Sequence, residues 1–143
     1  GLGSVRNVDE AHAAIKAGAQ FVVTPITKLA VIEACKNAGI PIMPGAFTPT
    51  EIATAHDAGA DVVKVFPART LGAGYIKDVL APMPYLKLMP TGGVDLENMA
   101  SFFKAGAVSV GVGGNLLDKK AIESGDWEKV SSIAFQYAMA ARV

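Results

Sequence analysis

The sequence predicts an α/β fold with a parallel sheet, arranged as part of a (β/α)8 TIM barrel. An Ala-Gly pair followed by an apolar run recurs along the chain, and the runs are rich in Val or Ile, as is typical of a strand buried on both faces. Each run is followed by a stretch with helical periodicity, and alternating strands and helices form parallel sheets. The recurring segments are 17–25, 38–45, 58–67 and 105–114, with PYLKLMPTGG at 84–93 between the last two.

Capping and turn residues set the order of the elements. Asn7 with Glu10, and Thr48 with Glu51, have the spacing of a capping box, and Asp95 is a third candidate N-cap. Glycines after alanines indicate helix C-termini. These signals predict helices near 8–17, 27–38, 49–58, 72–80, 95–105 and 126–141. They predict strands near 20–25, 40–46, 61–66, 86–91 and 107–112, with the tip of an earlier strand at 1–5.

The spacing of the repeats favours a closed barrel over an open, doubly wound sheet, which is the alternative. The first three segments begin 21 and 20 residues apart, and glycine pairs end the last two strands. Eight such units need roughly 180–200 residues. We therefore expect residues 1–143 to be a single domain, the C-terminal part of a barrel from the tip of strand 3 through helix 8. Roughly the first two to three β/α units are expected to precede Gly1.

Composition and charge restrict the partners. The 13 Lys and Arg residues balance 13 Asp and Glu residues, which gives no electrostatic basis for a nucleic-acid or membrane partner. Backbone amides could still hold a small anion without net positive charge. The single cysteine, Cys35, fits a reducing compartment, and no apolar run approaches the roughly 20 residues of a membrane span. We predict a cytoplasmic protein.

Lys64 is the foremost candidate for chemistry. In ADVVKVFPA it lies mid-strand, on the same face as Val62 and Phe66. In a barrel interior such an amine is poorly solvated, so its pKa falls, and a neutral amine can attack a ketone to form a Schiff base. The alternative is a buried lysine paired with an acid, and this strand alone does not distinguish the two. Lys87 also lies in an apolar strand, but near the opposite end from the rim where barrel active sites gather.

Two glycine-rich segments end the last two predicted strands. The first glycine loop is Thr91–Gly93, and the second is Gly113–Asn115. Glycines after the final two strands of a barrel leave backbone N–H groups free to hold a phosphate. Either loop alone is weak evidence because glycine is a common turn residue. Together they predict a phosphate site made of Gly92, Gly93, Gly113, Gly114 and Asn115.

The remaining polar and aromatic residues add less. His12 and His56 lie in predicted helices without Cys, Asp or Glu at ligand spacing, so we predict neither a metal nor a cofactor. Trp127 and Tyr137 are expected to pack the terminal helix. Every glutamate lies on or at the start of a predicted helix, so a proton-transfer carboxylate would have to come from an earlier strand. Ser4 is either a substrate ligand or a surface turn residue.

The motifs GLGSV, IPIMPGAFTPTEI, ADVVKVFPA, LMPTGGV and SVGVGGN, in this order, closely resemble the 2-keto-3-deoxy-6-phosphogluconate (KDPG) aldolase family. Members that are bifunctional also act as 4-hydroxy-2-oxoglutarate (KHG) aldolases. The resemblance extends over essentially the whole chain. It implies a metal-free class I aldolase on a (β/α)8 barrel, a homotrimer that serves the Entner–Doudoroff route by cleaving KDPG to pyruvate and glyceraldehyde 3-phosphate. KHG would give pyruvate and glyoxylate.

The resemblance also implies roles for individual residues. Lys64 matches the Schiff-base lysine, and the two glycine loops match the phosphate site, with Asn115 in place of a usual serine. Arg69 stands where a glutamate is frequent. The residues that match the pyruvate-binding pocket are Pro25, Phe66 and Thr91, with Ser4 in place of a usual threonine. The catalytic glutamate and the carboxylate-binding arginine of the family have no counterpart here.

Two other interpretations remain open. One is a different phosphate-binding barrel enzyme, of the epimerase or thiamine-phosphate synthase type, with Lys64 as a pocket residue. The other is a non-catalytic phosphosugar-binding barrel, or a fragment of one, because no acid/base residue is evident in the chain.

Overall fold

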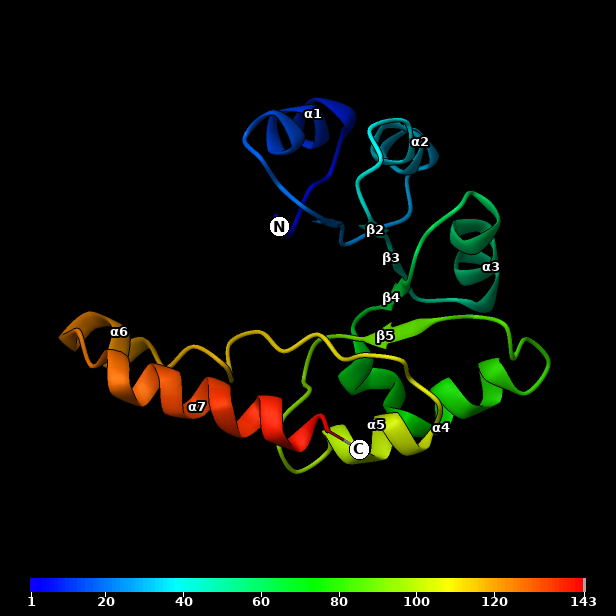
Figure 1. The fold of residues 1–143 in the computed structure, drawn as a ribbon. Helices are drawn as coiled ribbons and strands as arrows, with labels where there is room; N and C mark the ends of the chain where they lie inside the picture. The colour runs from blue at the N-terminus through cyan, green and yellow to red at the C-terminus, as the bar shows by residue number, and fades with distance from the viewer. Residues whose placement is uncertain (143) are drawn as a thin grey trace.

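The computed structural model describes residues 1–142 and has the α/β organisation that the repeats predict (Figure 1). Short parallel strands alternate with helices in chain order. The helices within this range are α1 (Val8–Lys16), α2 (Leu29–Asn37), α3 (Pro49–Asp57), α4 (Ala68–Leu80), α5 (Met99–Lys104), α6 (Lys119–Ser124) and α7 (Trp127–Ala140). The strands are β1 (Val22–Val23), β2 (Ile42–Met43), β3 (Gly45–Ala46), β4 (Val63–Val65) and β5 (Leu88–Pro90).

All strand pairs are parallel, and neighbours in the sheet follow the order of the chain. β1 pairs with β2, while β3, β4 and β5 form a three-stranded sheet in that order. Bridges extend the order at both ends, from Leu2 to Val22 and from Thr91 to Gly111. The predicted strand tip at 1–5 is therefore confirmed. Parallel strands paired in chain order, with a helix between each, are what βαβ units produce.

The predicted strand near 40–46 is divided at Pro44 between two pairings. Ile42 and Met43 pair with β1 on one side, whereas Gly45 and Ala46 pair with β4 on the other. The Lys64 amide donates to the carbonyl of Pro44 at 2.9 Å, so backbone hydrogen bonds continue past the division. The segment thus joins the two small sheets.

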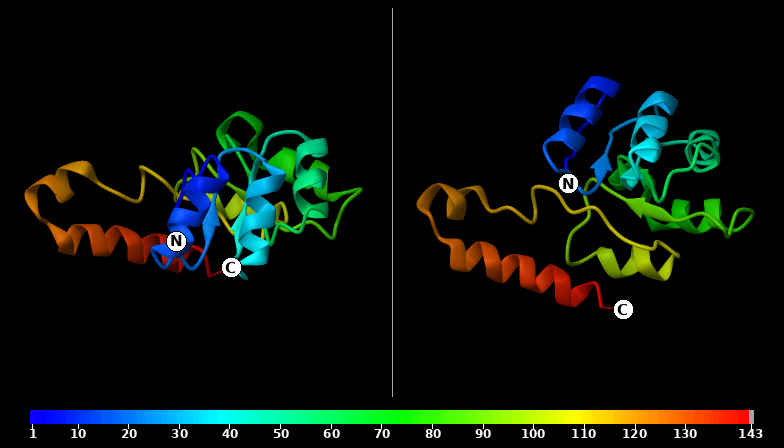
Figure 2. Two further views of the ribbon diagram at one scale, coloured as in Figure 1. Left: turned by 90° about the horizontal axis from the view of Figure 1, so that it is seen from above. Right: turned by 45° about the horizontal axis from the view of Figure 1, so that its top comes forward.

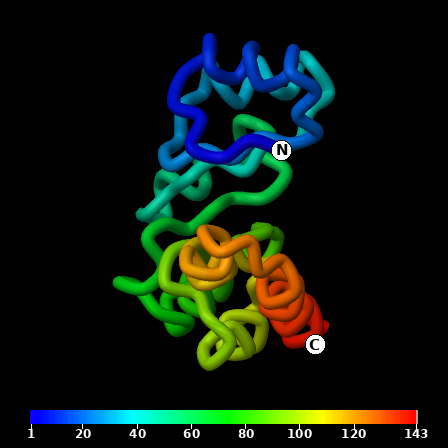
Figure 3. Tube along the Cα trace, turned by 90° about the vertical axis from the view of Figure 1, so that its left-hand side faces the viewer, coloured from blue at the N-terminus to red at the C-terminus, as the bar shows by residue number. Residues whose placement is uncertain are grey.

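Helices α1 to α5 follow one another along the outer side of the strands (Figure 1). Figure 2 shows the same succession from two further directions, with α6 and α7 extending away from the other helices. In Figure 3 the N-terminal helices lie at one end of the molecule and α7 at the other. The core between strands and helices is aliphatic, and its largest fully buried side chains include Ile32, Ile42, Ile52, Ile76 and Leu88.

The helix starts largely confirm the capping predictions. The Asn7 side chain accepts from the Glu10 amide at 2.8 Å, and Thr48 with Glu51 forms a complete capping box. Asp95 is not the N-cap of α5, so that prediction was wrong. Its carboxylate accepts from the amides of residues 97 and 98, which forms a turn, and α5 begins only after Asn98.

Several predicted boundaries differ from the structure. The segment near 107–112 contributes only the bridge at Gly111, although the amides of Val108 and Gly111 donate to the carbonyls of Leu88 and Pro90 at 3.1 and 2.9 Å. α4 begins at Ala68 rather than near 72, with a kink at Gly72. α6 was not predicted at all. In the terminal helix Tyr137 is buried as expected, but Trp127 is 63% exposed, so its predicted packing was wrong.

Candidate active site

Lys64 occupies the middle of β4, where flanking side chains are almost completely buried. Val63 and Val65 face the helices, with no more than 1% of either exposed. Lys64 is in register with Gly45 and Met89, and side chains in register lie on the same face of a sheet. Lys64 therefore shares the face of Met89, opposite the aliphatic core.

That face borders a largely apolar hollow of about 760 Å³. Strand side chains and the C-terminal half of α7 enclose it, and Val62 lies on its wall two residues before Lys64. The lining also includes Val23, Met43, Met89, Thr91, Val110, Gly113, Leu116, Tyr137 and Ala138. An apolar hollow with few polar groups at one end is typical of a small-molecule site.

The Lys64 amine is poorly solvated. The residue is 9% exposed, and its Nζ lies 4.6 Å from the centroid of the Phe66 ring. Desolvation lowers the pKa of Lys64 below its ordinary value. The ring partly opposes this effect, because an aromatic face favours a cation. None of the ion pairs found within residues 1–142 involves Lys64, so no carboxylate there restores its charge.

Thr91 directly follows β5, the strand that pairs with the strand of Lys64. Its amide donates to the Val65 carbonyl at 2.9 Å, and its hydroxyl donates to the Met89 carbonyl at 3.2 Å. The Thr91 side chain fills the space where a Cβ on Gly111 would lie. A Cβ on Gly92 would in turn lie 3.2 Å from the Phe66 ring. Lys64, Phe66, Thr91 and the first glycine loop therefore meet at the carboxyl ends of β4 and β5.

The carbonyl groups of the first glycine loop are hydrogen-bonded, whereas its amides remain free. The Thr91 and Gly92 carbonyls accept from the first two amides of α4, each at 2.8 Å, and the Gly93 carbonyl accepts from the Asn98 side chain, also at 2.8 Å. In the part of the chain that the structure describes, the N–H groups of Gly92 and Gly93 donate to no protein acceptor. Both residues have positive φ, of 90° and 82°, which glycine adopts without strain.

The second glycine loop repeats this pattern. Its Gly113 and Gly114 carbonyls accept from Leu116 and Leu117, while across residues 1–142 the amides of these glycines have no protein acceptor. Open space surrounds both glycines where a Cβ would lie. The Asn115 side chain donates to the Val94 carbonyl at 3.2 Å and so links the second loop to the end of the first. Two neighbouring loops with free amides can bind an anion such as phosphate.

No hydrogen bond joins Pro25 or Ser4 to Lys64 in the part of the chain that the structure describes. The backbone of Pro25 closely approaches Gly45, and the buried Thr24 hydroxyl donates to the Ile26 carbonyl at 2.6 Å, which fixes this strand end. Ser4 is exposed, has φ of 61°, and borders a separate cavity of about 320 Å³ shared with Glu10 of α1. Its predicted contact with substrate stays a prediction.

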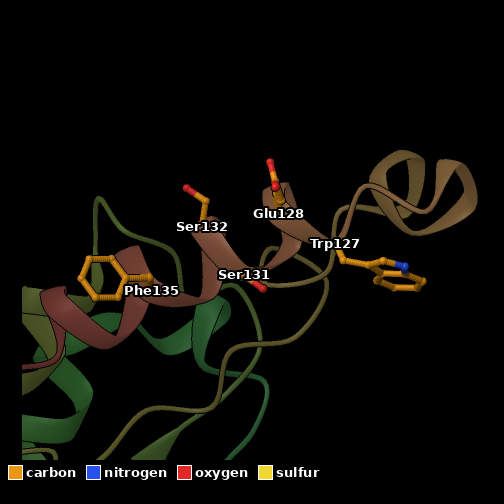
Figure 4. A pocket seen from close by; sticks show the side chains of 5 residues that line it. All are labelled: Trp127, Glu128, Ser131, Ser132 and Phe135. Carbon is orange, nitrogen blue, oxygen red and sulfur yellow. The ribbon is translucent and has the colours of Figure 1, made fainter.

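A second hollow contains none of the predicted site residues. A shallow hollow on α7 is lined by Trp127, Glu128, Ser131, Ser132 and Phe135, whose side chains Figure 4 shows spaced along the helix. Within residues 1–142, no three His, Cys, Asp or Glu side chains gather in a way that could hold a metal ion. No helix in that range is both long and apolar enough to cross a membrane.

Sequence reasoning missed three residues that shape the site. Gly45 and Gly111 lie where Pro25 and Thr91 leave no space for a side chain, and Thr24 is 2% exposed with its hydroxyl bonded. The only signals were a glycine inside each predicted strand, which can mark a close backbone approach, and a polar residue before Pro25.

The parallel strands and alternating helices place the chain in the α/β class, with a desolvated lysine and two amide-rich loops at one end of the sheet. The family model for KDPG and KHG aldolase matches residues 1–133. The 2-dehydro-3-deoxy-phosphogluconate aldolase of Treponema pallidum (strain Nichols) is 37% identical over 137 residues, which is 95% of this chain and 65% of that protein. The chain belongs to the KDPG and KHG aldolase family.

Other comparisons agree in sequence and in fold. The 2-dehydro-3-deoxy-6-phosphogalactonate aldolase of Escherichia coli (strain K12) is 36% identical over 81% of this chain and 57% of its own length. A solved structure described as native KDPGal superposes with a TM-score of 0.87 at 30% identity, over all of this chain and 70% of that one. KDPG aldolase from Legionella pneumophila, with pyruvate captured as a covalent carbinolamine, gives 0.86 at 26% identity, over 93% and 65%. The chain thus spans less than two thirds of the curated relatives named here.

Proposed function

We propose that the protein is a class I aldolase that cleaves a 2-keto-3-deoxy sugar acid through a Schiff base on Lys64. The substrate is KDPG, which yields pyruvate and glyceraldehyde 3-phosphate, and KHG is a second substrate that yields pyruvate and glyoxylate. The observation that carries the proposal is the desolvated amine of Lys64 beside two loops with free amides. The named relatives that are KDPG aldolases support the substrate class.

The reaction begins at the substrate ketone. The neutral Nζ of Lys64 attacks C2, and loss of water from the carbinolamine gives an iminium. As the C4 hydroxyl loses its proton, the C3–C4 bond breaks and its electron pair moves into the iminium, which leaves an enamine. The aldehyde departs, C3 takes up a proton, and hydrolysis releases pyruvate and the free amine. In this sequence a pyruvate carbinolamine, the species captured in the Legionella relative, forms last, when water adds to the pyruvate iminium before the amine is released.

Residues around Lys64 would hold the two ends of the substrate. Phe66, Thr91 and Pro25 would line the pyruvyl pocket, with Ser4 toward its carboxylate. The two glycine loops would bind the remote phosphate through their free amides and so fix the C3–C4 bond beside the amine. The proton acceptor would be a carboxylate outside residues 1–142, because the glutamates described lie on or beside helices.

The architecture proposed for the whole protein is a closed (β/α)8 barrel assembled as a homotrimer. Strand pairing in chain order supports the barrel, since six consecutive parallel segments already lie side by side. The trimer follows from the family resemblance. Sedimentation analysis of the full-length protein tests it, and a monomer would contradict this part of the proposal.

Borohydride reduction in the presence of pyruvate tests the function. The protein is expected to gain one irreversible pyruvate adduct, measured as an increase in intact mass, and to release pyruvate from KDPG. An epimerase or a phosphosugar-binding protein would bind phosphate but form no adduct. Absence of the adduct under conditions where inorganic phosphate binds would replace the aldolase proposal with one of those two.

A further inference from the structure

Arg69 lies directly beside the first glycine loop and is not part of the chemistry described above. Its amide donates to the Gly92 carbonyl at 2.8 Å, which fixes its backbone against the loop. A Cβ built on Gly93 would lie 2.5 Å from the Cβ of Arg69 and 3.0 Å from its Nε. The arginine side chain therefore runs across the open face of Gly93.

The guanidinium of Arg69 is free to bind a ligand. Arg69 is exposed, and none of the ion pairs found within residues 1–142 includes it. The neighbouring carboxylate of Asp95 accepts instead from the backbone amides of residues 97 and 98. A guanidinium next to the free amides of the first glycine loop complements a phosphate dianion better than the amides alone, because arginine can donate two parallel hydrogen bonds to phosphate oxygens.

We propose that Arg69 is a specificity-determining residue whose guanidinium binds the terminal phosphate of the substrate at the first glycine loop. This rests on the proposed function for the identity of the substrate, but not for the binding of phosphate. Arg69 would favour phosphorylated over unphosphorylated sugar acids. It would leave Schiff-base formation with pyruvate unaffected, because pyruvate has no phosphate.

Titration with inorganic phosphate tests the binding directly. In ¹⁵N-labelled protein the amide signals of Gly92 and Gly93 are expected to shift with phosphate concentration. Arg69→Gln should weaken the affinity about tenfold, since it removes a charge-assisted contact. Arg69→Lys should lose less, because it keeps the charge without the planar pair of donors.

Lys77→Gln is the matched control, since it removes one exposed cation from the same helix. It should bind phosphate as the parent protein does. Equal affinity in Arg69→Gln and the parent would overturn the proposal. So would an equal loss in Lys77→Gln, which would indicate general electrostatics, or phosphate shifts confined to amides away from the loop.

A second measurement separates this proposal from the aldolase assignment. Pyruvate trapping by borohydride should proceed equally in the parent and in Arg69→Gln, while the preference in kcat/KM for glyceraldehyde 3-phosphate over glyceraldehyde in the aldol direction falls about tenfold. If Arg69→Gln traps pyruvate and keeps the parent's preference for glyceraldehyde 3-phosphate, the role of Arg69 is refuted but the aldolase function is not. Arg69-dependent phosphate binding without any trapping would refute the aldolase function and leave the phosphate site standing.

Discussion

Lysines at the two ends of the strands differ in burial. Lys64 lies in β4 and Lys87 directly precedes the neighbouring β5, both in apolar sequence, yet Lys64 is buried and Lys87 is exposed. Lys87 instead borders a polar cavity of about 350 Å³ at the amino ends of the strands. There Lys36 pairs with Asp61 at 3.7 Å, with both side chains at least 40% exposed.

The comparison shows that position along a strand decides what a lysine can do. At the amino end, Lys87 is exposed to water and Lys36 pairs with the carboxylate of Asp61. At the carboxyl end, burial lowers the pKa of Lys64, and the nearby loops present free amides rather than carboxylates. At the carboxyl end the free amides can bind an anionic ligand. At the amino end the carboxylate of Asp61 already pairs with Lys36.

Replacing Lys64 and Lys87 in turn should give the largest difference in activity between the two ends. Lys64→Met is expected to abolish pyruvate trapping and KDPG cleavage, because no other lysine in residues 1–142 is buried. Lys87→Met should retain both within about twofold. Rates of pyruvate release check the prediction. Cleavage that survives in Lys64→Met, or is lost in Lys87→Met, would contradict it.

The pH dependence of trapping should show the effect of burial. Below the pKa of Lys64 the neutral fraction falls about tenfold per pH unit, so the trapping rate should rise with pH and level off below the ordinary lysine value of 10.5. The unfolded chain binds the Lys64 proton over a wider range, so stability should also rise with pH between the lowered and ordinary values. A midpoint at or above 10.5 would show that the amine is solvated.

Lys64→Met should also stabilise the fold at neutral pH, by on the order of 1 kcal/mol, because it removes an incompletely solvated charge. Thermal unfolding followed by circular dichroism measures this. The parent protein at pH values above the lowered pKa of Lys64 serves as the control, since the difference between the two proteins should shrink there. A variant that is less stable at neutral pH would indicate a carboxylate partner for the amine.

Gly111→Ala, at the carboxyl end of the strands, should reduce stability and trapping, but less than Lys64→Met reduces trapping. The Cβ of Gly111→Ala would collide with the hydroxyl and methyl groups of Thr91. We expect a loss of about 1–3 kcal/mol in unfolding free energy and a reduced trapping rate. Gly114→Ala is the control, because open space surrounds that position. Equal stability of Gly111→Ala and the parent would mean that Thr91 is not held there.

Changes at the amino end should have the smallest effects. Asp61→Asn removes the long, exposed ion pair with Lys36, although an amide oxygen can still accept from the Ile42 amide. Stability should change by less than about 1 kcal/mol, and trapping should stay the same. Chemical denaturation and the trapping assay measure the two effects. A large fall in trapping would show that the two ends are coupled.

Local patterns in the sequence predicted most of the fold. Helix starts at Asn7 and Thr48, the strands around 22 and 63, and the burial of Lys64 all follow from caps, alternation and apolar runs. α6 was missed although Asp118 caps it and Gly125 ends it with φ of 72°, because a helix of six residues is too short to show periodicity.

Contacts between distant segments account for what could not be predicted. Nothing in the local sequence shows that Thr91 fills the space beside Gly111, or that Arg69 crosses Gly93. The same holds for Asn98, whose side chain fixes the Gly93 carbonyl and so helps orient the first glycine loop. The glycine pairs predicted loops with free amides, but only the fold shows that their carbonyls are already bonded and that Asn115 links the loops.

The location of the reduced pyruvate adduct tests the central claim most directly. After borohydride reduction, proteolysis and mass spectrometry should assign a single modified lysine to the peptide that contains Lys64, with the Lys87 peptide unmodified. Modification of Lys87, or of several surface lysines to similar extents, would contradict the assignment of Lys64 as the amine that attacks the substrate ketone.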